Sequence, residues 1–209
     1  MTLSAICENA AKAGRDIDLS GCDYGPHKRS GLHLGPQPYY YLLAGFTQTL
    51  GLRKILEIGT SYGGSMMAIS RGCGRDLSAV ELVTVDKVNI AGEGLMALLH
   101  VKRVHGDSLS PATLRSVRNQ LSPPISLLYI DSKHSYEHTQ KNLDLYCAEF
   151  SPRFVILDDI HLNPEMDRLW SELSQRFGGD AFDASELAGR PSGFGILDCG
   201  RASPNLNAV

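Results

Sequence analysis

The sequence predicts an α/β protein built on a doubly wound, mostly parallel sheet. Short apolar runs that are typical of buried strands alternate along the chain with segments whose apolar residues recur at helical spacing. Several of these runs are followed directly by glycines or acidic residues. Strands that alternate with helices form a parallel sheet covered on both faces, and ligands bind such sheets at the carboxyl ends of the strands.

Length and composition are those of one domain of ordinary size. The chain has 209 residues, of which 43% are hydrophobic and 21% are charged. A chain of this length can bury a sizeable core without disulfides or a structural metal. The 20 Lys and Arg residues stand against 23 Asp and Glu residues and give a formal net charge of -3. This balance argues against a surface that neutralises many phosphates, so no nucleic-acid partner is expected.

The chain is expected to work in the cytoplasm, away from membranes. It has no apolar run of about 18 residues, as a membrane span requires, and its N-terminal segment lacks the apolar core of a signal peptide. Its five cysteines are odd in number and include no CxxC pair. We therefore expect buried free thiols in a reducing compartment, not a disulfide framework or a zinc site.

Residues 1–36 are expected to form an N-terminal arm before a main domain over residues 37–209. Glycine and proline break the arm into short pieces, and residues 9–12 favour a short helix. The arm is either a lid over the site or a loosely packed extension. Together with the region after Asp159, it is expected to supply walls of an acceptor pocket, from Tyr24, His27, His33, Tyr39 and Tyr40.

The first half of the main domain is expected to contain two helices and three strands. Apolar spacing predicts a helix over residues 39–50 and a buried strand over 54–58. A glycine-rich turn then leads into a helix through residues 66–69. A second strand is expected at 82–85 and a weaker third at 101–104.

The second half continues the alternation. Ser110 and Pro111 predict the start of a helix, with serine as N-cap and proline at the first helical position. Strands are expected at 125–130 and 154–157, each followed by a helix with one apolar face.

Two final short runs, 181–183 and 193–197, have only a tight turn region between them. They are expected to form an antiparallel pair at the sheet edge.

A glycine-rich loop, residues 59–65, follows the first strand of the main domain. Glycine lets the backbone turn tightly and approach a ligand closely. The helix N-terminus behind the loop offers free N–H groups, which suit a carboxylate or a phosphate. The spacing is not GxGxxG, and no Gly-Lys-Ser/Thr of a P-loop occurs.

Acidic residues follow the second and third strands in the order that an adenosine-type ligand requires. Asp86 ends the second strand, where a carboxylate can hydrogen-bond the paired hydroxyls of a ribose. Asp107 and Ser108 follow the third strand, where a carboxylate can accept a hydrogen bond from an adenine amine. Three loops matched to one ligand are more informative than any one of them.

Three aspartates follow the next two strands. Asp158 and Asp159 are consecutive and would repel each other unless a cation lay between them. Asp131, at the end of the neighbouring strand, could complete a three-oxygen site. Hard oxygen ligands of this kind suit Mg²⁺.

A candidate general base lies beside these acids. His134 comes three residues after Asp131, and histidine titrates near neutral pH. Lys133 and His161 are its competitors for this role.

The chain resembles the class I S-adenosylmethionine-dependent methyltransferases, which have a Rossmann-like fold. Within them it is most similar to the metal-dependent small-molecule O-methyltransferases: catechol O-methyltransferase, the macrocin and mycinamicin sugar O-methyltransferases, and the cephalosporin-hydroxylase-like group. The resemblance covers about residues 37–200 and rests on KILEIGTSYGGS, VTVD, HGDS, LLYIDSKHSYEHTQKNLDLY and FVILDDIH. It implies a seven-stranded sheet whose last strand is antiparallel.

The resemblance also implies roles for individual residues. The methionine moiety of the cofactor would be surrounded by Glu57, Gly59, Thr60, Ser61, Gly63 and Ser65. The cofactor would also contact Asp86 at its ribose, Asp107 and Ser108 at its adenine, and Asp131. The Mg²⁺ ligands would be Asp131, Asp158 and Asp159. His134 falls where the catechol enzymes have a lysine base and the sugar enzymes have a histidine, which favours a hydroxyl of a sugar or another natural product.

The expected function is therefore metal-assisted methyl transfer from S-adenosylmethionine to a small-molecule hydroxyl, with His134 as the base. Three alternatives stay open. The first is a nicotinamide-dependent oxidoreductase, which the absence of a GxGxxG motif argues against. The second is a non-catalytic protein of this fold, which would not need acids at every strand end. A nucleic-acid methyltransferase would need more than scattered basic residues. The sequence leaves the oligomeric state open, and a homo-oligomer is compatible with it.

Overall fold

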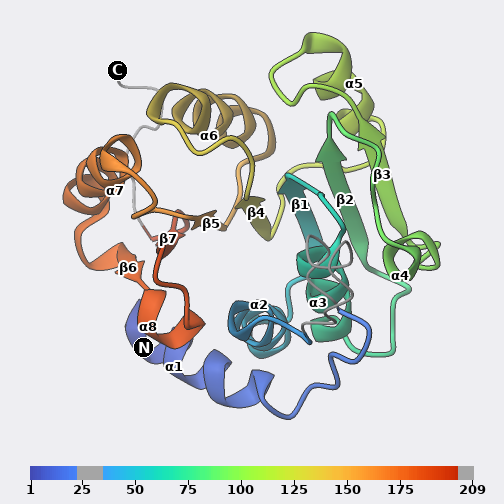
Figure 1. Cartoon of the computed structure of the whole chain (residues 1–209), viewed down its shortest axis with the longest axis horizontal. Coiled ribbons are helices and arrows are strands. Elements are labelled where there is room, and N and C mark those ends of the chain that lie inside the picture. The colour runs from blue at the N-terminus through green and yellow to red at the C-terminus, as the bar shows by residue number, and fades with distance from the viewer. Residues whose placement is uncertain (23–34, 202–209) are drawn as a thin grey trace.

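The computed structural model describes residues 1–22 and 35–201, which form one seven-stranded sheet covered by helices on both faces (Figure 1). The strand order is β3-β2-β1-β4-β5-β7-β6. The strands are β1 (Lys54–Ile58), β2 (Glu81–Asp86), β3 (Val101–His105), β4 (Leu127–Ile130), β5 (Phe154–Asp158), β6 (Ala181–Asp183) and β7 (Phe194–Asp198). The last strand, β7, runs antiparallel to both of its neighbours, β5 and β6. The expected fold class and the antiparallel pair of final strands are both confirmed.

Helices cover the two faces in separate groups. Within the described residues the α-helices are α1 (Leu3–Gly14), α2 (Pro38–Leu50), α3 (Gly64–Gly72), α4 (Glu93–Met96), α5 (Pro111–Arg118), α6 (Tyr136–Phe150), α7 (Pro164–Phe177) and α8 (Ser185–Ala188). Figure 1 shows α1, α2, α3 and α8 below the sheet, and α5, α6 and α7 above it. The expected helix start at Ser110 is confirmed, since Ser110 caps α5 through the Thr113 amide. The expected helix after the 154–157 strand is also confirmed, as α7.

Alternation along each strand divides the core into two layers. Ile55 of β1 belongs to the layer under α1, α2 and α3, whereas its neighbour Leu56 belongs to the layer under α5, α6 and α7. Successive side chains of a strand point to opposite faces, so a strand covered on both sides must be apolar throughout. This explains why the central strands are near-continuous apolar runs.

The N-terminal segment packs more closely than the sequence suggested. Helix α1 begins after the Thr2 N-cap and is longer than the expected 9–12. A Cβ added to Gly45 of α2 would lie 1.9 Å from the carbonyl oxygen of Ala10 in α1, so the two backbones are in direct contact. Residues 3–22 are therefore part of the core, which corrects the alternative of a loosely packed extension for them.

The lid role and the domain division at residue 36 stay predictions. Tyr24, His27 and His33, which were expected to line the acceptor pocket, lie outside the described residues.

All five cysteines lie within the described residues and none is in a disulfide; four of them are buried and Cys199 is partly exposed. Burial raises the pKa of Cys7 to about 12, and burial likewise raises the pKa of Cys199 to about 12. These thiols are therefore held in the unreactive protonated form. Over residues 1–22 and 35–201, no helix combines the length and the apolar character needed to cross a membrane.

Candidate active site

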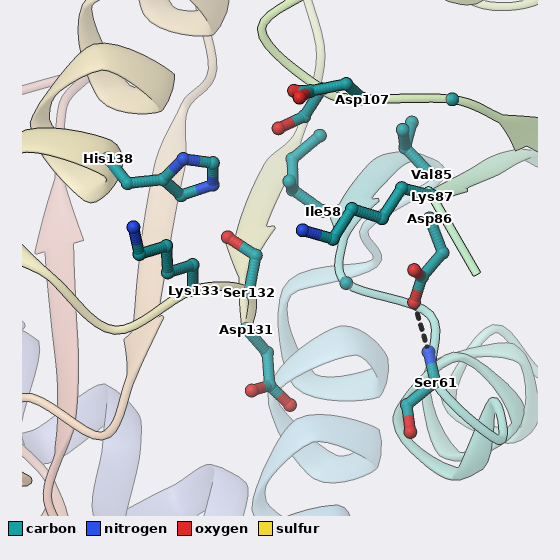
Figure 2. Close-up of a pocket in the computed structure, with 13 residues that line it drawn as sticks. Ile58, Ser61, Val85, Asp86, Lys87, Asp107, Asp131, Ser132, Lys133 and His138 are labelled. Atoms are coloured by element: carbon teal, nitrogen blue, oxygen red, sulfur yellow. Dashed lines mark hydrogen bonds between the residues drawn. The ribbon is translucent and has the colours of Figure 1, made fainter.

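The candidate site lies at the carboxyl edge of the sheet, where the strand order reverses between β1 and β4. Two cavities open there. The first, of about 300 Å³, lies between the loops that follow β1, β2, β3 and β4 (Figure 2). The second, of about 150 Å³, lies between the glycine-rich loop, helix α2 and the ends of β4 and β5. Ser61 and Asp131 line both cavities, so the two form neighbouring halves of one site.

The glycine-rich loop passes directly beneath the loop that follows β4. Gly59 has a φ of +106°, and a Cβ at this position would lie 1.7 Å from the carbonyl oxygen of Asp131. Ser61 also has a positive φ, of +45°, which is uncommon for a residue with a side chain. Any residue but glycine at position 59 would push the two loops apart.

Asp86 is held in place by the backbone around it. Its Oδ2 accepts a hydrogen bond of 2.7 Å from the Ser61 amide, which Figure 2 shows as a dashed line. Its Oδ1 accepts one of 2.8 Å from the Val88 amide. Each oxygen retains a lone pair, so the carboxylate can still accept from a ligand hydroxyl. Its position at the cavity supports the expected ribose contact, which stays a prediction.

Asp107 and Ser108 line the other end of the first cavity. The Asp107 carboxylate accepts from the Leu109 amide at 2.9 Å, and the Ser108 carbonyl accepts from the Tyr146 hydroxyl at 2.8 Å. Figure 2 shows Lys133 and His138 facing this end from across the cavity.

Two of the lining residues, Lys87 and His138, were not found from the sequence. Lys87 directly follows Asp86, the last residue of β2, so its position after a strand end was a signal for it in the sequence. His138 lies one helical turn after His134, in α6, and carries no comparable signal.

Glu57 lies beneath the glycine-rich loop and is fully buried. It accepts hydrogen bonds of 2.5 Å from the hydroxyls of Ser65 and Thr84. Burial raises the pKa of Glu57 to about 7, against the lowering effect of these two hydrogen bonds. The carboxyl group thus links the start of α3 to β2. Thr60, Gly63 and Ser65 line the second cavity, and their expected contact with the methionine moiety of the cofactor stays a prediction.

Asp131, His134 and Asp159 meet at the second cavity. The His134 Nε2 lies 3.6 Å from Asp131 Oδ1 and 3.2 Å from Asp159 Oδ2. The Asn163 side-chain amide donates to the His134 carbonyl at 3.0 Å and so anchors this loop to the start of α7. Burial, followed by the charge of Glu57, raises the pKa of Asp131 to about 7.

The structure separates His134 from its two competitors. His161 hydrogen-bonds through both ring nitrogens, to Asp167 at 2.7 Å and to Asp183 at 2.8 Å. Lys133 lines the first cavity. His134 alone of the three lines the second cavity.

The arrangement does not fit the expected Mg²⁺ site at Asp131, Asp158 and Asp159. Arg190, between α8 and β7, donates to both oxygens of Asp158, at 3.0 Å from Nε and 2.5 Å from Nη2. Its Nη2 also lies 3.1 Å from Asp159 Oδ1. Across the described ranges, no group of three or more His, Cys, Asp or Glu side chains is placed to hold a metal ion. The cation beside the two aspartates is a guanidinium, which the sequence analysis missed.

Fold and site together define an α/β protein with two adjoining cavities at the strand ends, one of them lined by acids that could accept hydrogen bonds from an adenosine. A family model described as a methyltransferase domain matches residues 56–160. The chain therefore belongs to this methyltransferase family. No protein with a curated function matches it.

Solved structures share the fold at low sequence identity. The O-methyltransferase TomG from Streptomyces achromogenes, involved in tomaymycin synthesis and solved with SAM, has a TM-score of 0.60 at 20% identity and covers 91% of this chain and 95% of its own. An O-methyltransferase from Bacillus cereus, solved with SAH, gives 0.56 at 18% and covers 93% and 90%. MycE, a methyltransferase of the mycinamycin pathway solved with Mg and SAH, gives 0.53 at 13% and covers 80% and 51%.

Proposed function

We propose that this protein transfers the methyl group of S-adenosylmethionine to a hydroxyl of a small molecule, with His134 as the general base. The observation that carries the proposal is the pair of adjoining cavities that share Ser61 and Asp131. One is lined by the acids suited to an adenosine, and the other holds the histidine and two tyrosines. Two structures of the same fold, TomG and the Bacillus cereus enzyme, are O-methyltransferases solved with SAM or SAH.

The first cavity suits the cofactor because it lies between four strand-end loops, one of which contains a glycine at position 59 where a side chain would not fit. Gly59 lets the loop after β1 pack against the loop after β4. The carboxylates of Asp86 and Asp107 are held by backbone amides and can accept further hydrogen bonds from a ligand. When bound, S-adenosylmethionine supplies an electrophilic methyl group. The surrounding carboxylates suit the positive charge of its sulfonium.

In the second cavity, the chain's own residues would orient and deprotonate the acceptor. With a proton on Nε2, His134 donates to Asp159 and retains Nδ1 as an acceptor. The carboxylate then stabilises the imidazolium that forms when the hydroxyl proton is taken up, as acids do in other histidine-based sites. Tyr39 and Tyr40 of α2 line the same cavity and would pack against the acceptor.

For the acceptor, we propose a sugar or another natural-product hydroxyl in preference to a catechol. His134 stands where the sugar enzymes of the resembling family have their histidine, and two proteins of the same fold, TomG and MycE, act in natural-product pathways. The proposal contains no metal step, because Arg190 engages Asp158 and Asp159.

Binding is tested first, by calorimetric titration with S-adenosylhomocysteine and, in parallel, with NADH. We expect S-adenosylhomocysteine to bind at one site per chain and NADH not to bind. Tight NADH binding would instead support the oxidoreductase alternative. Binding of neither ligand to the folded protein would support the non-catalytic one.

The base is tested by single-turnover methyl transfer to acceptors found in a panel of sugars, natural-product alcohols and catechols. His134→Ala should lower the rate by about 10²-fold or more, the usual contribution of a general base, and should leave the affinity for S-adenosylhomocysteine nearly unchanged. His161→Ala and Lys133→Ala are the matched controls, since they replace the two competitors. A His134→Ala variant with near-normal turnover would exclude this histidine as the base.

A further inference from the structure

Asp158 and Asp159 already have a cation in this fold, the guanidinium of Arg190. The Asp158 side chain is fully buried and the Arg190 side chain is 19% exposed. The two meet in a bidentate pair, in which the two N–H groups of the guanidinium match the two oxygens of a carboxylate. Burial works to lower the pKa of Arg190, but the hydrogen bonds and charge of Asp158 raise it overall, so the group is a permanent cation.

The carboxylate oxygens of Asp158 and Asp159 that a metal would need already have partners in the protein. Both oxygens of Asp158 accept from Arg190. Oδ1 of Asp159 accepts from the Ser192 hydroxyl and lies beside Arg190, while Oδ2 lies 3.2 Å from the His134 ring. A divalent ion would need these same oxygens at about 2.1 Å and would bring its two charges against the guanidinium.

The position of Arg190 is fixed by the backbone on both sides. The Arg190 amide donates to the Ser185 carbonyl at 3.0 Å. Farther along the loop, the Asp159 amide donates to the Gly193 carbonyl at 2.9 Å. The guanidinium carbon also lies 4.7 Å from the centre of the Tyr39 ring, an attractive cation–π arrangement.

Arg190, Tyr39, Asp159 and His134 all line the second cavity. On the basis of the proposed function, we propose that Arg190 is the resident cation of the acceptor site and replaces a divalent metal, so that methyl transfer is metal-independent. Arg190 is then a positioning residue: it neutralises Asp158 and part of Asp159 and leaves Asp159 Oδ2 to orient His134.

Metal binding can be tested without any activity. Mn²⁺ prefers the same oxygen ligands as Mg²⁺, and its spin-resonance signal reports the free ion during titration of the full chain. We expect the native protein not to take up Mn²⁺ at a stoichiometric site. Uptake of one Mn²⁺ per chain that Asp158→Asn abolishes would overturn the proposal.

Removing the guanidinium should expose the acids to a metal. We expect Arg190→Met to bind Mn²⁺ at least about tenfold more tightly than the native chain, because Asp158 and Asp159 lose their cation. A variant that folds but gains no Mn²⁺ affinity would contradict the idea that Arg190 keeps metals out.

Arg153→Met is the matched control. Arg153 forms the same kind of bidentate pair with the buried Asp198, at 2.9 and 3.3 Å, and lies 5.1 Å from the Phe154 ring centre. This pair stands at the opposite end of β5. Arg153 is more exposed than Arg190, and Asp198 also lies 3.2 Å from Arg201, so the control should lose less stability and should show no gain in Mn²⁺ affinity.

The catalytic consequence is measured once an acceptor is found. EDTA should change turnover by less than about twofold, whereas a metal-dependent site would lose its activity. Arg190→Lys, which retains the charge, should keep more activity than Arg190→Met, and both should bind S-adenosylhomocysteine as the native chain does, since Arg190 lines the second cavity. EDTA-sensitive turnover would overturn the inference but not the proposed methyl transfer. If Arg190→Met does not fold, the native Mn²⁺ titration and Arg190→Lys decide.

Discussion

Two buried carboxyl groups, those of Glu57 and Asp158, determine how charge is distributed at this site. Glu57 has no exposed surface and is satisfied by two hydroxyl donors, whereas Asp158 is satisfied by a guanidinium. Burial raises the pKa of both carboxyl groups, and the hydroxyl donors of Glu57 and the guanidinium beside Asp158 act against this rise. Two buried acids of the site are therefore held differently, Glu57 by neutral donors under the loop and Asp158 by a cation at the acceptor cavity.

The raised pKa of Glu57 predicts a dependence of stability on pH. Burial raises this pKa from 4.5 to about 7, so between these values the folded state binds more protons than the unfolded state. The free energy of unfolding should then fall as the pH rises through this window, by about 3 kcal/mol, at about 1.4 kcal/mol per pKa unit. Urea unfolding across the window measures it.

Glu57→Gln should remove the part of this pH dependence that Glu57 contributes, because the amide keeps the shape of the side chain and cannot ionise. The part contributed by Asp131, whose pKa is also raised to about 7, should stay. The exposed Glu8 provides the control, and Glu8→Gln should leave the slope as it is in the native chain. An unchanged slope in Glu57→Gln would mean that another group carries the effect.

At the level of helices and strands, the contact between α1 and α2 positions the side of the second cavity that α2 forms. α2 carries Tyr39 and Tyr40 into the second cavity, and a Cβ on Gly64 would lie 2.4 Å from the Tyr40 hydroxyl. The Tyr40 ring is thus fitted against the start of α3. Because α2 lies between α1 and the glycine-rich loop, the packing of the N-terminal helix sets how far α2 approaches the site.

Widening the contact between α1 and α2 should destabilise the protein. A Cβ on Gly45 would clash with the backbone of α1, so Gly45→Ala should lower the free energy of unfolding by about 2–3 kcal/mol, as overpacking does. Gly179→Ala is the control, since a Cβ there meets nothing within 4 Å. Chemical denaturation of both variants gives the comparison, and equal stability would show that α1 can shift without cost.

For the molecule as a whole, the sheet joins two apolar layers into one cooperative unit. α1 belongs to one layer, and Trp170 of α7 belongs to the other. Every central strand contributes side chains to both layers, so neither layer can lose its packing alone.

This arrangement predicts a single unfolding transition. Trp170 is the one tryptophan of the chain, so its fluorescence reports the layer under α7, while far-ultraviolet circular dichroism reports all helices. The two denaturation curves should coincide, as two-state unfolding requires. A helical transition that precedes the change in fluorescence would show that residues 1–22 unfold as a separate arm.

Much of the fold could be predicted from periodicity because buried strands and amphipathic helices have different repeats. The strands β1, β2, β4 and β5 lie within about a residue or two of the expected ranges. The short helices α4 and α8 were missed, since four residues carry no readable period. The close packing of α1 was missed because it depends on two glycines, Gly14 and Gly45, whose meeting is a tertiary fact.

The candidate site was predictable where chemistry follows a strand end directly. Asp86, Asp107 and Asp131 line the first cavity as expected, because parallel strands bring their carboxyl ends to one edge. Glu57 is fully buried and lines neither of the two cavities. Successive residues of a strand point to opposite faces, and the sequence does not show which face lies toward a ligand, so its expected contact with the cofactor stays a prediction.

The sequence by itself determined the class of fold, the edge of the sheet where the two cavities lie, and the acids gathered there. The tertiary structure alone decided which cation those acids face. Arg190 is 32 residues from Asp158, in a turn whose path depends on how the antiparallel strand β7 returns beside β5. An electrostatic partner is chosen by distance in space, and for residues this far apart in the chain only the folded packing sets that distance.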